Sequence, residues 1–121
     1  MTKSINLGIP NGVLFIRDRL SRDFPEMEGK GWVWSTPSFI TLMCLHEQEG
    51  ETQVTIGRSS DVRESGELMF DGVLETPSRE IVVDIVPGEP ILIANVDSEK
   101  TRVRIFGNAG RHSDDVAIAL S

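Results

Sequence analysis

The sequence is poor in the residues that mark extracellular scaffolds, metal centres and membrane spans. It contains one cysteine, two histidines and no tyrosine. The single Cys44 excludes an intramolecular disulfide, and its position in the apolar stretch 40–45 predicts a buried, unreactive thiol. No stretch approaches the ~18 consecutive apolar residues of a transmembrane helix, and residues 1–7 lack the apolar core of a signal peptide. We therefore expect a cytoplasmic protein that makes no membrane contact.

Motifs that carry out chemistry are also missing. Cys44, His46 and His112 do not have the spacing of zinc ligands. No nucleophile elbow presents a serine, and the glycines of residues 107–110 match neither the P-loop nor the dinucleotide fingerprint. The sequence therefore predicts no catalytic residue, no metal site and no cofactor, and we expect a protein that is not an enzyme. An enzyme that uses scattered acids or His112 stays open as a third hypothesis, behind two binding functions.

The charge is strongly one-sided. Acidic residues outnumber basic ones by 19 to 12, which gives a formal net charge of -7. A field of this sign repels phosphate backbones and anionic lipids, so we expect no direct contact with nucleic acid. The same field speeds association with basic proteins. Solubility alone also accounts for an acidic surplus, so the charge permits a basic partner without requiring one.

Short apolar segments recur along the second half of the chain. They follow one another about every 8–12 residues, as in sandwiches and barrels, and cover residues 68–74, 81–86, 91–96, 103–106 and 116–120. A chain of 121 residues has the size of one domain, so we expect residues 1–121 to form a single domain. The prediction is an all-β fold, an antiparallel β-sandwich of about eight to nine strands with little helix. Its expected core includes Val83, Ile85, Ile91, Ile93, Val103, Ile105 and Ile118.

The first half of the chain is less regular. An Asn-Gly pair supplies a tight turn between the apolar segments 5–9 and 13–16, which predicts a strand pair or one bent strand. Residues 17–31 form the longest candidate loop, and long loops in compact domains often carry function. Residues 36–46 fit either a strand or a buried helix, and their β-branched and aromatic content favours the strand.

An acidic turn in the first half is a candidate partner-binding surface. Glu47, Glu49 and Glu51 form the tip of a predicted hairpin that joins the apolar segment 39–45 to a strand at 53–57. Their carboxylates would be exposed at this tip. A basic partner is the kind of molecule that such a tip would attract.

Two tryptophans form a second candidate surface. Trp32 and Trp34 are predicted to lie on one face of one strand, because side chains two residues apart point the same way. Tryptophan is enriched at binding hot spots, so the pair would serve as apolar anchors for a partner. Filling the core or covering a sheet edge is the plainer explanation.

Two arginines are predicted to point outward from a C-terminal strand. Arg102 and Arg104 alternate with the apolar residues of segment 101–106. Ion pairs with Glu80 and Asp84, which their own alternation places toward solvent, account for the two arginines. Recognition of an anion or carboxylate on a partner is the alternative.

The last third of the chain resembles a known family in the order of its segments. A strand carrying an acid is followed by Val86-Pro87-Gly88, Pro90-Ile91-Leu92-Ile93-Ala94, Thr101-Arg102-Val103-Arg104-Ile105 and a closing strand at 115–120. This order is similar to the end of the competence-nuclease inhibitor (ComJ-like) family of small bacterial proteins. The resemblance implies a cytoplasmic, non-enzymatic β-sandwich that blocks a nuclease by binding it. It assigns no inhibitory residue in this sequence.

Two binding functions follow from these features. The first is a protein-binding module, an inhibitor or immunity-type partner of a basic enzyme such as a nuclease or toxin. The alternative is a β-sandwich that binds a small molecule or carbohydrate through Trp32, Trp34 and nearby loops. Exposed sheet edges would also allow two copies to pair, so a homodimer is compatible with either function.

Overall fold

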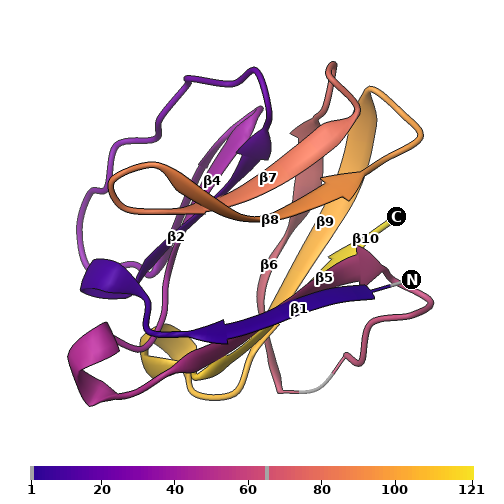
Figure 1. Cartoon of the computed structure of the whole chain (residues 1–121). Helices are drawn as coiled ribbons and strands as arrows, with labels where there is room; N and C mark the ends of the chain where they lie inside the picture. The colour runs from indigo at the N-terminus through magenta and orange to yellow at the C-terminus, as the bar shows by residue number, and fades with distance from the viewer. Residues whose placement is uncertain (1, 65) are drawn as a thin grey trace.

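Two five-stranded β-sheets pack face to face in the computed structural model, which describes residues 2–64 and 66–121 (Figure 1). Sheet A contains, in spatial order, β1 (Thr2–Leu7), β5 (Thr52–Arg58), β10 (Asp115–Leu120), β9 (Lys100–Gly107) and β6 (Glu67–Glu75). Sheet B contains β3 (Val33–Thr36), β4 (Phe39–Met43), β2 (Val13–Asp18), β7 (Glu80–Ile85) and β8 (Glu89–Asn95). Three 3₁₀ turns complete the elements, η1 (Pro10–Gly12), η2 (Glu47–Glu49) and η3 (Gly110–His112). The predicted all-β sandwich is confirmed, with ten strands in the described residues rather than eight or nine.

The core lies between the sheets and is built from branched apolar side chains. The predicted alternation is confirmed along β9 and β10, where Val103, Ile105 and Ile118 are fully buried. Ile16 of β2 and Ile40 of β4 belong to the same buried cluster from the side of sheet B. Burial of each such side chain stabilises the fold by about 1.5–3 kcal/mol, so the two sheets are held together mainly by this layer.

β4 and β5 do not form the predicted hairpin. β4 pairs with β2 and β3 in sheet B, whereas β5 pairs with β1 and β10 in sheet A. The strand prediction itself is confirmed, because residues 39–43 are extended rather than helical. Nearly all of β4 is buried, and such a strand fits the middle of either sheet, so its sequence does not reveal its neighbours. Within the described residues no helix is long and apolar enough to cross a membrane.

The first turn also sends the chain from one sheet to the other. Asn11 and Gly12 both have positive φ angles, of 58° and 63°. The N–H of Gly12 donates to the carbonyl of Ile9 at 2.9 Å, which closes the turn. β1 and β2 therefore lie in different sheets and do not pair with each other. The β5–β10 pair is parallel, and the remaining strand pairs given for residues 2–64 and 66–121 are antiparallel.

The side chains of β8 that face the core are not the set that the sequence predicts. Leu92 lies opposite Val83, and it is buried in the core with an exposed fraction of 9%. Ile93 is 40% exposed, so its predicted core position is wrong. Ile91 packs against the core from a partly buried position. Residues 91–94 are all apolar and allow either alternation, and only the pairing with β7 decides between them.

The long loop predicted at residues 17–31 is present but begins later, because Arg17 and Asp18 belong to β2, and it is well anchored. Residues 19–32 contain no strand or helix. At its start, the buried carboxylate of Asp18 accepts a hydrogen bond from the hydroxyl of Ser78 at 2.6 Å. Further along, the hydroxyl of Thr36 donates to the carbonyl of Asp23 at 2.8 Å. These bonds hold the loop against sheet B.

The thiol of Cys44 is buried, as predicted, and this has a consequence at high pH. Burial raises the pKa of the thiol from 9.0 to about 12. Above about pH 9 the unfolded chain loses this proton while the folded chain keeps it, so stability falls as pH rises. We expect the stability advantage of the wild type over Cys44→Ala to shrink by about 1.4 kcal/mol per pH unit up to about pH 12.

Urea unfolding of both proteins at about pH 8 and about pH 10 checks this expectation. The Cys44→Ala variant is the matched control, because its other titrating groups are unchanged. A difference between the two proteins that stays constant across this range would contradict the burial of the thiol.

Candidate functional site

Three short turns gather at one end of the sandwich, at the lower left of Figure 1. The backbone N–H of Glu47 in η2 donates to the carbonyl of Ile9, just before η1, at 3.1 Å. The N–H of Leu45 donates to the carbonyl of Ser113, just after η3, at 2.9 Å. These bonds fix turns that are far apart in the sequence. We call the surface formed by η1, η2 with Glu51, and η3 the turn end.

The turn end carries the three predicted acidic residues in exposed positions. His46 stabilises η2, because its Nδ1 accepts a hydrogen bond from a backbone N–H of the turn at 3.1 Å. Glu47 and Glu49 form no ion pair with the described residues. Glu51 accepts a hydrogen bond from the Nδ2 of Asn6 at 3.2 Å. Among the described residues the three carboxylates therefore have no cationic partner, and their charge is available to another molecule.

Trp32 also lies at the turn end, beside η3. A methyl group built on Gly110 would stand 3.9 Å from two carbons of the Trp32 ring. The carbonyl of Trp32 accepts a hydrogen bond from the N–H of Met43 at 2.8 Å, which ties this residue to sheet B. The ring is partly exposed, and the exposed side chains of Arg111 and His112 follow Gly110 in η3. The turn end thus combines an acidic turn, an apolar ring and a basic turn.

Trp34 is held by a different part of the chain. Its Nε1 donates to the carbonyl of Glu28 at 2.8 Å, and its ring lies beside Gly31. β3 begins at Val33, so Trp32 lies in the bend before the strand and Trp34 lies within it. The ring of Trp32 therefore lies beside Gly110, whereas the ring of Trp34 lies beside Gly31. Trp34 fastens the long loop to the edge of sheet B.

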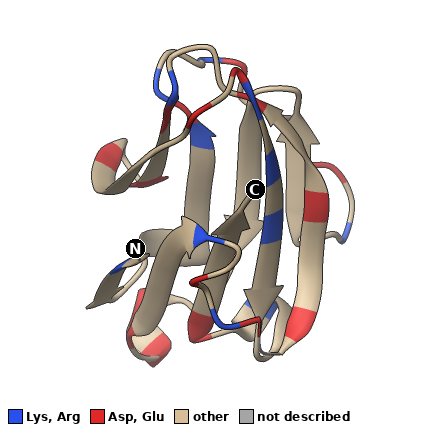
Figure 2. Cartoon of the chain, turned by 90° about the vertical axis from the view of Figure 1, so that its right-hand side faces the viewer, with Lys and Arg blue, Asp and Glu red and all other residues tan. Residues whose placement is uncertain are grey.

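Arg102 and Arg104 lie on the outer face of sheet A, and both are engaged. Figure 2 shows the basic positions of β9 alongside acidic positions of β6. Arg102 donates from Nε and Nη2 to the two carboxylate oxygens of Asp71, at 3.0 and 2.8 Å. This bond holds the pKa of Asp71 below its ordinary value and raises the pKa of Arg102. Arg104 pairs with Glu64, and its guanidinium carbon lies 5.7 Å from the ring centroid of Phe106.

The predicted partners of these arginines lie in the other sheet. Glu80 pairs with Arg19 at 3.1 Å, and Asp84 pairs with Arg17 at 2.8 Å. The prediction that Asp84 faces water is wrong, because its side chain is buried and only 4% of the residue is exposed. Asp71 engages the Nε and Nη2 of Arg102, so this exposed pair competes with an anionic ligand for the same nitrogens.

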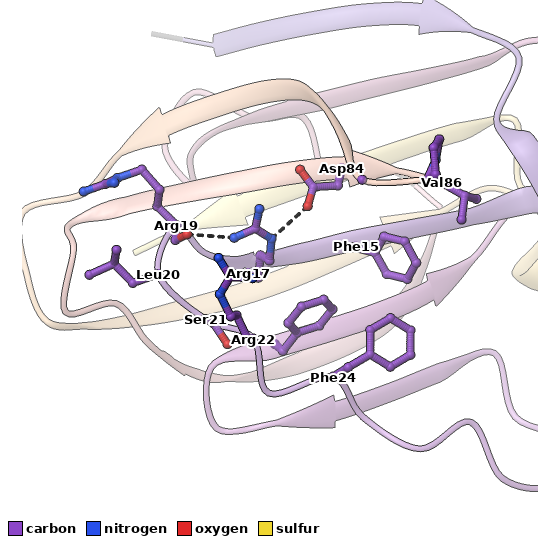
Figure 3. A pocket seen from close by; sticks show the side chains of 12 residues that line it. Phe15, Arg17, Arg19, Leu20, Ser21, Arg22, Phe24, Asp84 and Val86 are labelled. Carbon is purple, nitrogen blue, oxygen red and sulfur yellow. Dashed lines mark hydrogen bonds and ion pairs between the residues drawn. The ribbon is translucent and has the colours of Figure 1, made fainter.

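The outer face of sheet B carries a hollow of about 540 Å³ that the sequence did not predict (Figure 3). The rings of Phe15 and Phe24 line it together with the Arg17–Asp84 pair. One feature of the sequence pointed to a buried ion pair at this place. It is an acid inside an otherwise apolar strand, and an acid that is buried needs a partner. Periodicity alone does not show which arginine that partner is.

The fold and the turn end define a two-sheet β-sandwich that presents charged turns and a partly exposed tryptophan at one end. Among the residues that the structure describes, no three His, Cys, Asp or Glu side chains are grouped to hold a metal ion. No protein-family model matches the sequence, and neither does any curated protein.

A solved structure is nevertheless similar. It is the crystal structure of ComJ from Bacillus subtilis, described as an inhibitor of the DNA degrading activity of NucA. The TM-score is 0.65 over 98% of this chain and 93% of that chain, at 12% sequence identity. The likeness confirms the resemblance expected from the last third of the chain and extends it, as a likeness of fold, to nearly the whole chain.

Proposed function

We propose that this protein is a non-enzymatic, inhibitor-type binding protein whose partner is a nuclease or another basic enzyme. The observation that supports the proposal most is the likeness of fold to ComJ over 98% of the chain, because ComJ is described as an inhibitor. The net charge of -7 has the sign that attracts a basic protein. Enzymes that act on nucleic acid need positive surfaces to hold phosphates, so they suit an acidic inhibitor.

The turn end is the surface that we assign to this partner. Its exposed carboxylates at Glu47, Glu49 and Glu51 form no ion pair with the described residues, so pairing with a partner's lysine or arginine displaces no internal ion pair. Trp32 supplies a partly exposed apolar ring beside η3, in the manner of a hot spot surrounded by polar groups. Backbone hydrogen bonds already fix the turns, so binding would lose little conformational entropy.

A nuclease assay tests the proposal. The full chain is added to purified NucA, and to nucleases encoded beside its own gene, while DNA degradation is followed. We expect stoichiometric addition of the chain to stop at least one of these enzymes. Full activity of every enzyme, with no complex on gel filtration, would overturn the proposal.

A charge-neutralised variant tests the assigned surface. Glu47→Gln/Glu49→Gln/Glu51→Gln should slow association with the inhibited enzyme by about tenfold or more at low salt. The difference should shrink at high salt, because ions screen the attraction. The matched control is Glu75→Gln/Asp97→Asn/Glu99→Gln, which removes the same charge from exposed positions near the start of β9, at the opposite end of that strand from η3. Equal slowing by the two triple variants would show that net charge acts, and not the turn end.

A further inference from the structure

The hollow on the outer face of sheet B has the dimensions of a ligand site. Its volume is about 540 Å³, within the range of about 300–1,000 Å³ typical of small-molecule pockets. It lies between the start of the long loop and the turn that joins β7 to β8, which contributes Val86, Pro87 and Gly88. It is separate from the turn end, so the inference drawn from it goes beyond the proposed function.

One wall of the hollow is aromatic and incompletely covered. The ring centroid of Phe24 lies 5.2 Å from that of Phe15 and 5.3 Å from that of Phe39. Phe24 is nevertheless 53% exposed, and its neighbour Leu20, which also lines the hollow, is exposed. An apolar group seated against these rings would remove further apolar surface from water, which is favourable.

The charges around the hollow favour an anion. The Nε of Arg17 donates to Asp84 at 2.8 Å, and its Nη1 donates to the carbonyl of Arg19 at 2.8 Å. Arg19 itself pairs with Glu80. Within the described residues, neither the Nη2 of Arg17 nor the guanidinium of Arg22 has a hydrogen-bond or ion-pair partner. Arg17 and Arg19 therefore each engage one carboxylate, and among the described residues the guanidinium group of Arg22 engages none.

We infer that this hollow binds a small apolar carboxylate, with an aromatic or branched apolar body. The body lies against the rings of Phe15, Phe24 and Phe39, and the carboxylate accepts hydrogen bonds from Arg17 and Arg22. A guanidinium group held in place by other bonds is suited to carboxylate recognition, because little ordering remains to be done on binding. An ammonium ligand is disfavoured by the same arginines.

A titration of the full chain with 3-phenylpropionate, followed by amide NMR shifts, tests the inference. We expect saturable shifts at residues that line the hollow, and weaker binding at high salt. 3-Phenylpropanol has the same body without the charge, and it should bind at least about tenfold more weakly. 3-Phenylpropylamine should give no saturable shifts there.

Variants then distinguish specific binding in the hollow from non-specific binding of the ligand elsewhere on the protein. Arg22→Gln and Phe24→Ala should each weaken binding of 3-phenylpropionate by about tenfold, and both residues are exposed enough for the fold to persist. Arg102→Gln, on the other sheet, is the matched control and should leave the affinity unchanged. The inference is overturned if millimolar 3-phenylpropionate gives no saturable shift. It is also overturned if the alcohol or the amine binds equally well, or if the control variant loses as much affinity. These outcomes leave the nuclease assay unaffected.

Discussion

Leu92→Asp is expected to abolish cooperative unfolding, whereas Ile93→Asp leaves a folded protein of nearly unchanged stability. Leu92 is 9% exposed and packs in the shared core, so a carboxylate there would be buried without a partner. Such burial costs several kcal/mol, and the total stability of a domain is only about 5–15 kcal/mol. Ile93 is 40% exposed on the opposite face of the same strand, so a carboxylate there stays in contact with water.

Urea unfolding followed by circular dichroism measures the contrast. Both variants introduce an aspartate, at adjacent positions of one strand, so each serves as the control for the other. Loss of the transition in Ile93→Asp, with a normal transition in Leu92→Asp, would show that β8 is registered one residue away from the described position.

The second large effect is expected at Arg17. Arg17→Met removes the cation that neutralises the carboxylate of Asp84. Asp84 is only 4% exposed. Removing one partner of a buried ion pair typically costs about 3–5 kcal/mol, because the remaining charge is left uncompensated in a medium of low dielectric constant. The guanidinium also donates to the carbonyls of Asp18 and Arg19, so the start of the long loop would loosen as well.

The neighbouring arginine offers a matched control. Arg19→Met breaks an exposed pair with Glu80, and exposed pairs contribute about 0–1 kcal/mol. The double variant Arg17→Met/Asp84→Leu should recover most of the stability lost in Arg17→Met, because no buried charge is left over. Equal free energies of unfolding for Arg17→Met and Arg19→Met would contradict the structural role of the buried pair.

The fold was predictable where apolar and polar residues alternate strictly. In β9, Val103 and Ile105 alternate with Arg102 and Arg104, and only one register buries the apolar set. In β8, Leu92 and Ile93 are adjacent and both apolar, so the same reasoning had no way to choose. The pairing of β8 with β7 determines which of the two residues faces the core, and that pairing depends on the tertiary structure.

The candidate site was predictable only in its local parts. The acidic turn at Glu47 and Glu49 follows from composition, and it is present. The contacts that position the arginines join Arg17 to Asp84 and Arg102 to Asp71, across 67 and 31 residues of sequence. The pattern of charges in the sequence identifies the acidic and basic residues, but it does not show which of them form ion pairs. Trp32 lies beside η3 for the same long-range reason, because that turn comes from the other sheet.

The place of β10 sets the order in which sheet A is completed. Residues 115–120 lie between β5 and β9, and they join the β1–β5 pair to the β9–β6 pair. While the ribosome still holds this segment in its exit tunnel, β10 cannot pair with β5 or with β9. The facing edges of these two strands in the nascent chain are therefore unpaired. Such edges attract chaperones and other chains. The sandwich therefore closes only after synthesis has passed these residues.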